Sequence, residues 1–141
     1  MLYPIRITPD GHGGFDAAAR DLPQLVTGGA TEAEALALAE DALEVVVAGH
    51  IDENEDLPLP SPAEPGERLV AVPAQIAAKV AVWRAWRAAD ISKSELARRM
   101  GVAENEVRRI LSAGHATKLE RLDEAARALG ARLVVDLAAA A

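Results

Sequence analysis

The stretch that most restricts the fold is SKSELARRMGVAENEVRRIL, residues 92–111, in which two short amphipathic segments flank a Gly-Val pair. Ser92 and Glu95 have the spacing of a capping box and begin the first segment. Ala97 is small at a position where two helices must cross closely, and Gly101 permits the turn between them. Apolar residues fit the buried sides of both helices at Leu96, Met100, Val102, Val107 and Ile110. The joint spacing predicts a helix-turn-helix unit.

A helix-turn-helix unit inserts its second helix into the major groove of DNA, and this one carries phosphate-binding charge at Lys93, Arg98, Arg99, Arg108 and Arg109. Asn105 and Arg109 fall near the exposed start and middle of the second helix, so we expect them to contact base edges. The residues expected at phosphates are Lys93, Ser94, Arg108 and His115. Glu104 either accepts from a cytosine or supports the helix N-terminus. The alternative is an ordinary helical hairpin with a solvated charged face.

Further helices are expected on both sides of this unit. Pro73 suits the first turn of a helix whose apolar face is lined by Ile76, Val80, Trp83 and Trp86, where core packing of the tryptophans is favoured over stacking on bases or on a partner. Ala103 cannot cap the second helix of the motif, so either Glu106 caps it or the helix starts loosely. Thr117 and Glu120 form another capping box, before a helix buried through Leu119, Leu122, Ala126 and Leu129.

The last apolar stretch, residues 132–137, reads as a strand with few neighbours in a helical unit. Pairing with the same strand of a second copy would give hydrogen-bond partners to the backbone groups along its edge. We therefore expect a homodimer or a higher oligomer.

The N-terminal half has a different pattern. Tyr3, Ile5 and Ile7 alternate with polar positions, and glycines separate two more short extended segments, GGFDAAA and LVTGG. A helix follows from the capping box of Thr31 and Glu34 to Gly49, with its inner face at Leu36, Ala39, Leu43 and Val46. ERLVAV then reads as a strand returning to the same sheet, in the order β-β-β-α-β.

The stretch DENEDLPLPSPAEPG, residues 52–66, contains four prolines and reads as a linker or loop. We expect two domains, residues 1–72 and residues 73–141. Residues 1–66 carry thirteen acidic and two basic side chains, a net charge of −11, whereas residues 67–141 carry thirteen basic and nine acidic side chains, a net charge of +4. The acidic half suits a cationic protein, and the basic half suits phosphates.

Catalysis and cofactors are not expected. Asp10, Asp16 and Asp21 are the candidate metal-binding carboxylates, but two-metal hydrolysis needs three or four carboxylates that converge from a complete sheet. The three histidines, His12, His50 and His115, lack metal-ligand spacing. The chain has no cysteine, which excludes disulfides and cysteine-ligated zinc. The start lacks a leader pattern, and Gln75 and Lys79 interrupt the longest apolar stretch, so we expect a cytoplasmic protein without a membrane segment.

Nearly the whole chain resembles the HicB antitoxin family in its version with a C-terminal helix-turn-helix of the XRE type. The resemblance is carried by RDLPQLVTGGATEAEALALAEDALE, by VWRAWRAADISKSELARRMGVAENEVRRIL and by TKLERLDEAARALGARLVV. It implies an α+β protein with an N-terminal partial RNase H-like domain and a C-terminal all-helical domain that ends in a strand. Gln24 departs from the family, which usually has glycine after DLP.

The resemblance also implies two partners. One is HicA, a small basic ribonuclease that cuts messenger RNA, and the other is operator DNA of the shared operon. The candidates for toxin contacts are exposed acids on the first helix, Glu32, Glu40 and Glu44. The alternative is an orphan helix-turn-helix regulator whose N-terminal domain senses a ligand or binds another protein.

Overall fold

The computed structural model describes residues 1–139 and divides the chain into two compact units. The first contains Met1–His50 and Asp56–Pro73, and the second contains Ile51–Glu55 and Ala74–Ala138. Each unit is described by itself below. The predicted α+β class is confirmed, because strands and one helix come first and four helices follow.

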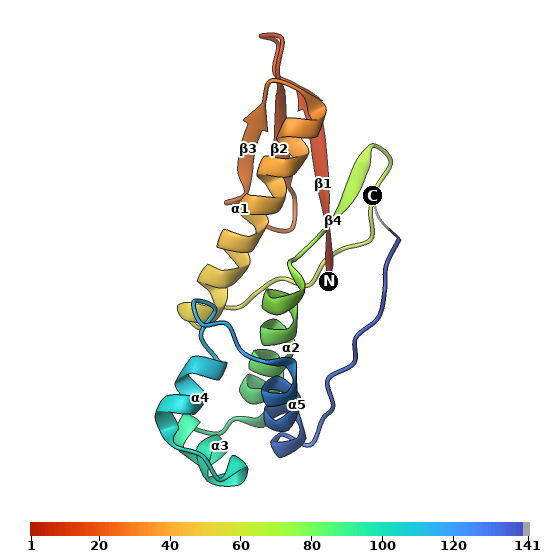
Figure 1. Ribbon diagram of the computed structural model, residues 1–141. Helices are drawn as coiled ribbons and strands as arrows, with labels where there is room; N and C mark the ends of the chain where they lie inside the picture. The colour runs from red at the N-terminus through yellow and green to blue at the C-terminus, as the bar shows by residue number, and fades with distance from the viewer. Residues whose placement is uncertain (140–141) are drawn as a thin grey trace. The chain divides into compact units, whose positions relative to one another are not determined.

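A four-stranded antiparallel sheet forms the first unit (Figure 1), with strand order β3-β2-β1-β4. Its strands are β1 (Leu2–Pro9), β2 (Phe15–Ala19), β3 (Val26–Gly29) and β4 (Glu67–Ala71). Tyr3 pairs with Val70 and Ile5 with Ala19, and all four side chains are buried. The alternation of apolar residues in β1 therefore predicted both the strand and its inner face, and the predicted order β-β-β-α-β is confirmed.

The helix α1 (Glu32–Asp52) runs along one face of this sheet (Figure 1). Thr31 begins it as predicted, because its hydroxyl oxygen accepts a hydrogen bond from the Glu34 backbone at 3.1 Å. Two details of the prediction are wrong. The helix continues three residues past Gly49, and its fully buried row is Ala35, Ala39, Leu43 and Val47, whereas Leu36 and Val46 are half-buried. An alanine-rich helix is apolar on several sides, so periodicity alone leaves its rotation ambiguous.

Residues 53–66 form no helix or strand, but they are not a free linker. The Tyr3 hydroxyl donates to the Pro58 carbonyl at 2.6 Å, and the Asp21 carboxylate accepts from the Ser61 backbone and hydroxyl at 2.8 and 2.6 Å. Burial opposes ionisation of Asp21, yet the Ser61 hydrogen bonds hold the pKa of its carboxyl below the usual value. Arg20 donates to the Pro62 carbonyl. These hydrogen bonds hold the proline-rich loop in place within the first unit.

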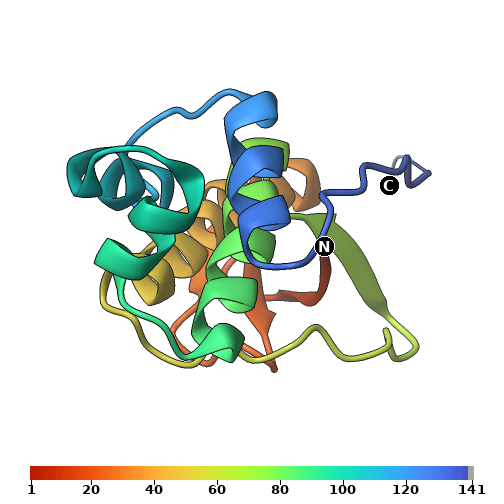
Figure 2. The same cartoon turned by 90° about the horizontal axis from the view of Figure 1, so that it is seen from below.

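Four helices form the second unit: α2 (Ala74–Ala89), α3 (Lys93–Met100), α4 (Glu104–Ile110) and α5 (Leu119–Ala128). Figure 2 shows α5 alongside α2, and α3 lies against α4 and α5. Trp83 is 1% exposed and its indole donates to the Asn54 side chain at 3.2 Å. Trp86 is half-buried. Core packing, the role favoured for the tryptophans, is therefore confirmed for Trp83.

The C-terminal part of the second unit differs from the prediction in three ways. Thr117 does not cap α5, which begins after Lys118 without any side-chain cap. Leu119 is 48% exposed instead of buried, and Leu129 is only half-buried. Residues 131–139 form no strand within the single chain. A strand needs a hydrogen-bonded neighbour, and the second unit has no strand to supply one. Pairing across a two-fold axis stays a prediction.

Candidate nucleic-acid interface

The connection between α3 and α4 is a tight glycine turn. Ser92 precedes α3 in an extended conformation, and its hydroxyl oxygen accepts from the Glu95 backbone at 3.0 Å. Gly101 has a φ of 70°, which favours glycine because it has no Cβ. The backbone of Val102 then donates to Ala97 at 3.0 Å, and Ala97 is buried at the crossing. The local geometry of the predicted turn is therefore present.

The helix α4 is short and lacks a side-chain cap at Ala103, as its sequence predicted. Glu106 does not replace that cap, because its carboxylate forms an ion pair with Arg121 on α5. Val107 and Ile110 are buried, and this fixes the opposite side of α4 toward solvent. Packing and not capping therefore holds the start of this helix.

Asn105 and Arg109 lie one turn apart on the exposed side of α4. Within residues 1–139 neither side chain has a hydrogen bond or an ion pair with another residue. Both border an open hollow of about 530 Å³ that Lys118 and Arg121 also line. Unpaired amide and guanidinium groups on one exposed helix face are suited to bidentate contacts with base edges.

Glu104 joins α3 to α4. Its carboxylate accepts from the Ser94 hydroxyl at 2.9 Å and from the Arg108 guanidinium at 2.7 Å. These two bonds lower the pKa of the Glu104 carboxyl. This geometry favours the role in which Glu104 supports the N-terminus of α4. To accept a hydrogen bond from a cytosine, its carboxylate would have to give up its bonds to Ser94 and Arg108.

The other basic side chains of the motif are also placed by local contacts. Arg98 and Arg99 both donate to Glu95, at 2.6 and 3.1 Å, and these bonds lower the pKa of the Glu95 carboxyl to about 2. The ammonium of Lys93 lies 5.8 Å from the centre of the Trp86 ring. His115 is exposed in the loop that follows α4.

Sequence reasoning missed Lys79, which holds the end of α4 in place through hydrogen bonds. Lys79 on α2 is fully buried, and its ammonium donates to the carbonyls of Arg109 and Ile110 and to the Thr117 hydroxyl. The sequence signal for this role is a lysine within the apolar stretch AQIAAKVAVW. From the sequence alone, we interpreted Lys79 only as an interruption of that stretch.

The candidate toxin contacts lie in the first unit. Glu32, Glu40 and Glu44 are exposed on α1, and Glu32 forms an ion pair with Arg68 on β4 at 3.3 Å. Gln24, which replaces the usual glycine, has no positive φ, and its amide lies 2.8 Å from the ring nitrogen of His50. The turn after DLP therefore does not require glycine for its backbone conformation in this chain.

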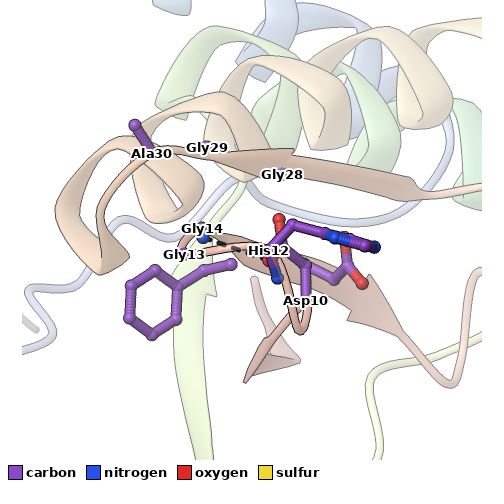
Figure 3. Close-up of a pocket in the computed structure, with 9 residues that line it drawn as sticks. Asp10, His12, Gly13, Gly14, Gly28, Gly29 and Ala30 are labelled. Atoms are coloured by element: carbon purple, nitrogen blue, oxygen red, sulfur yellow. Dashed lines mark hydrogen bonds between the residues drawn. The ribbon is translucent and has the colours of Figure 1, made fainter.

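The carboxylates considered for metal binding do not converge. Asp10 and Asp16 line a hollow beside the glycines of the β1–β2 turn and the end of β3 (Figure 3). Asp21 does not line this hollow, and its carboxylate accepts a hydrogen bond from the Ser61 hydroxyl. The Asp10 carboxylate accepts from the backbones of His12 and Gly14 at 2.6 and 3.0 Å. Across residues 1–139, no group of three or more His, Cys, Asp and Glu side chains could hold a metal ion. No helix in that range is long and apolar enough to cross a membrane.

Comparison with known proteins gives one consistent result. A family model described as the HicB-like antitoxin of bacterial toxin-antitoxin systems matches residues 2–81. The chain is 38% identical over 133 residues to Antitoxin HicB of Escherichia coli strain K12, across 94% of this chain and 96% of that protein. It is 36% identical over 137 residues to Antitoxin HicB 1 of Photorhabdus laumondii, across 97% and 87% of the two chains. Antitoxin HicB of Pseudomonas fluorescens is 33% identical over 121 residues, across 85% and 83%.

Proposed function

Because the chain belongs to the HicB-like antitoxin family, we propose that it neutralises a HicA messenger-cleaving ribonuclease by direct binding and represses its own operon by binding operator DNA. On this proposal the protein is a cytoplasmic regulator and not an enzyme. Residues 1–72 hold the toxin, and residues 73–141 bind DNA and dimerise.

The observation that carries the DNA-binding part is the exposed face of α4. Asn105 and Arg109 project from a helix whose opposite side is anchored in the core, and both side chains are unpaired within the described chain. Arg108 is exposed but bonded to Glu104, so a phosphate can recruit it only by replacing that carboxylate. This arrangement supports base contacts from Asn105 and Arg109 and phosphate contacts from Arg108, Lys93, Ser94 and His115.

A DNA titration tests this part. The probe is a fluorescent duplex from the region upstream of the gene, compared with an unrelated duplex of the same length. Asn105→Ala and Arg109→Ala are each expected to weaken binding by about 1–3 kcal/mol and to relax preference at one base, whereas Arg108→Ala weakens both duplexes alike. Arg68→Ala is the matched control, because it removes the same charge from β4. Unchanged binding by all three α4 variants would contradict the assignment of α4.

The acidic charge of the N-terminal half supports the toxin-binding part. Residues 1–66 have a net charge of −11, and α1 exposes Glu40 and Glu44. A basic ribonuclease would be attracted to such a surface, so association is expected to slow as salt rises, while buried apolar contacts hold the complex.

Growth measurements test the toxin-binding part. Co-expression of the full chain with a HicA-type protein from the adjacent reading frame is expected to restore growth and stop messenger cleavage. The Arg109→Ala variant is expected to rescue equally well, because its change lies in the DNA-binding face. Toxicity equal to that of the toxin alone, with the chain present at normal levels, would favour the orphan-regulator alternative.

A further inference from the structure

The buried ammonium of Lys79 is the feature of the second unit that the proposed DNA-binding role leaves unexplained. Lys79 lies on α2 and is 0% exposed, the only charged residue buried to this degree within residues 1–139. Placing an ammonium in the interior is unfavourable unless hydrogen bonds compensate for the lost hydration.

All three N–H donors of Lys79 have acceptors at the end of α4 and just beyond it. The distances from its Nζ are 2.9 Å to the Arg109 carbonyl, 3.0 Å to the Ile110 carbonyl and 2.8 Å to the Thr117 hydroxyl. The last carbonyls of a helix lack partners inside the helix and carry its partial negative charge. Lys79 thus acts as a cap on the C-terminal end of α4, supplied by another helix.

The same side of α2 also holds the segment that follows. The Gln75 amide oxygen, one turn before Lys79, accepts from the Thr117 backbone at 2.8 Å. Asp52 accepts from the Ala113 backbone at 2.9 Å, and its charge partly offsets the effect of burial on Lys79. Burial lowers the pKa of Lys79 to about 8, so its ammonium is mostly protonated at pH 7.

The two ends of α4 are therefore held differently. Its start has no side-chain cap at Ala103, but its end is fixed by Lys79 at the carbonyl of Arg109 itself. A helix of seven residues is too short to be stable alone, so its position depends on such contacts. The backbone atom that Lys79 holds belongs to the residue expected to read a base, whereas Asn105 lies one turn away.

We propose that Lys79 is a positioning residue that sets the direction from which the Arg109 side chain reaches its base, and that it thereby contributes to sequence preference without touching DNA. This inference rests on the proposed role of α4. A residue that merely stabilises the second unit would affect contacts by Asn105 and Arg109 alike, whereas a positioning residue acts through Arg109.

A double-mutant cycle on the full chain tests the proposal, with the upstream duplex and the unrelated duplex as probes. Lys79→Met keeps most of the side-chain volume and removes the charge and all three donors. It is expected to weaken binding to the upstream duplex by about 3- to 10-fold in the wild-type and Asn105→Ala backgrounds, and by less than about 2-fold in the Arg109→Ala background. Circular dichroism of each variant checks that the helices are retained.

Thr117→Val provides a second test if Lys79→Met does not fold. It removes one of the three acceptors, keeps the backbone bond to Gln75, and is expected to show the same Arg109-dependent loss at about 2-fold. Equal losses in the Arg109→Ala and Asn105→Ala backgrounds would reduce Lys79 to a structural residue and overturn the proposal alone. If Arg109→Ala itself binds like wild type, the base contact of Arg109 and with it the proposal for Lys79 are overturned, whereas the assignment of α4 fails only if Asn105→Ala and Arg108→Ala also bind unchanged.

Discussion

Raising the pH from 7 to 9 is expected to stabilise the folded second unit through Lys79. Its pKa is about 8 in the folded chain and 10.5 as the unperturbed value. The unfolded chain therefore binds this proton more tightly than the folded chain does, and the difference in pKa corresponds to about 3 kcal/mol of destabilisation at pH 7. As the pH passes 8, folded Lys79 releases its proton while the unfolded side chain keeps it, so the penalty decreases.

The size of the effect follows from the two pKa values. Between pH 7 and pH 9, the free energy of unfolding is expected to increase by about 1 kcal/mol from this group, since only the folded form titrates in that window. Lys79→Met has no such proton to lose. The difference in unfolding free energy between wild type and Lys79→Met is therefore expected to shift by the same amount in favour of wild type.

Urea unfolding at pH 7, 8 and 9 measures this difference. Tryptophan fluorescence is a suitable probe because both tryptophans, Trp83 and Trp86, lie on α2 in the second unit. Other groups that titrate in this range are common to the two chains and cancel in the comparison. A constant difference across the three pH values would show that Lys79 does not carry a buried charge.

Three further changes test local parts of the structure. Ser92→Ala removes the cap of α3 and is expected to lower the melting temperature by an amount equivalent to about 1 kcal/mol, whereas Ala103→Ser supplies the missing cap of α4 and is expected to raise it by a similar amount. If both substitutions move the melting temperature in the same direction, capping does not explain the difference between the two helices. Deletion from Arg132 onward is expected to yield monomers and to reduce affinity for the upstream duplex through lost bivalency. Sedimentation that still shows a dimer would refute pairing through residues 132–137.

Local patterns predicted most of the elements in the first unit. The alternation around Tyr3 and Ile5 and the Thr31 cap depend on neighbours within a few residues, and such signals are readable from sequence. The hydrogen bonds that hold the proline-rich loop in place were not predictable from such local signals. Its bonds join Ser61 to Asp21 and Pro58 to Tyr3, pairs separated by 40 and 55 residues.

In the candidate site, too, features set by neighbouring residues were predictable from the sequence, and features set by distant residues were not. The exposure of Asn105 and Arg109 follows from the helical spacing of Val107 and Ile110, which are buried. Thr117 has the local pattern of a cap, but its hydroxyl bonds to Lys79, 38 residues earlier in the chain. A distant ammonium thus overrides a local preference, and no pattern within the TKLE segment indicates it.

The pairing of arginines with glutamates on the α3–α4 surface affects how the proposed interface would discriminate between DNA sequences. Arg98, Arg99 and Arg108 are paired with glutamates at exposed positions, where an ion pair contributes about 0–1 kcal/mol. Phosphates can replace these carboxylates at little cost, but each replacement adds less attraction than an unpaired cation would provide. Binding to arbitrary DNA is then weak for a surface with this many arginines. In the proposed interface, discrimination would therefore depend on Asn105 and Arg109, whose side chains have no protein partner within residues 1–139 to give up when they meet a base.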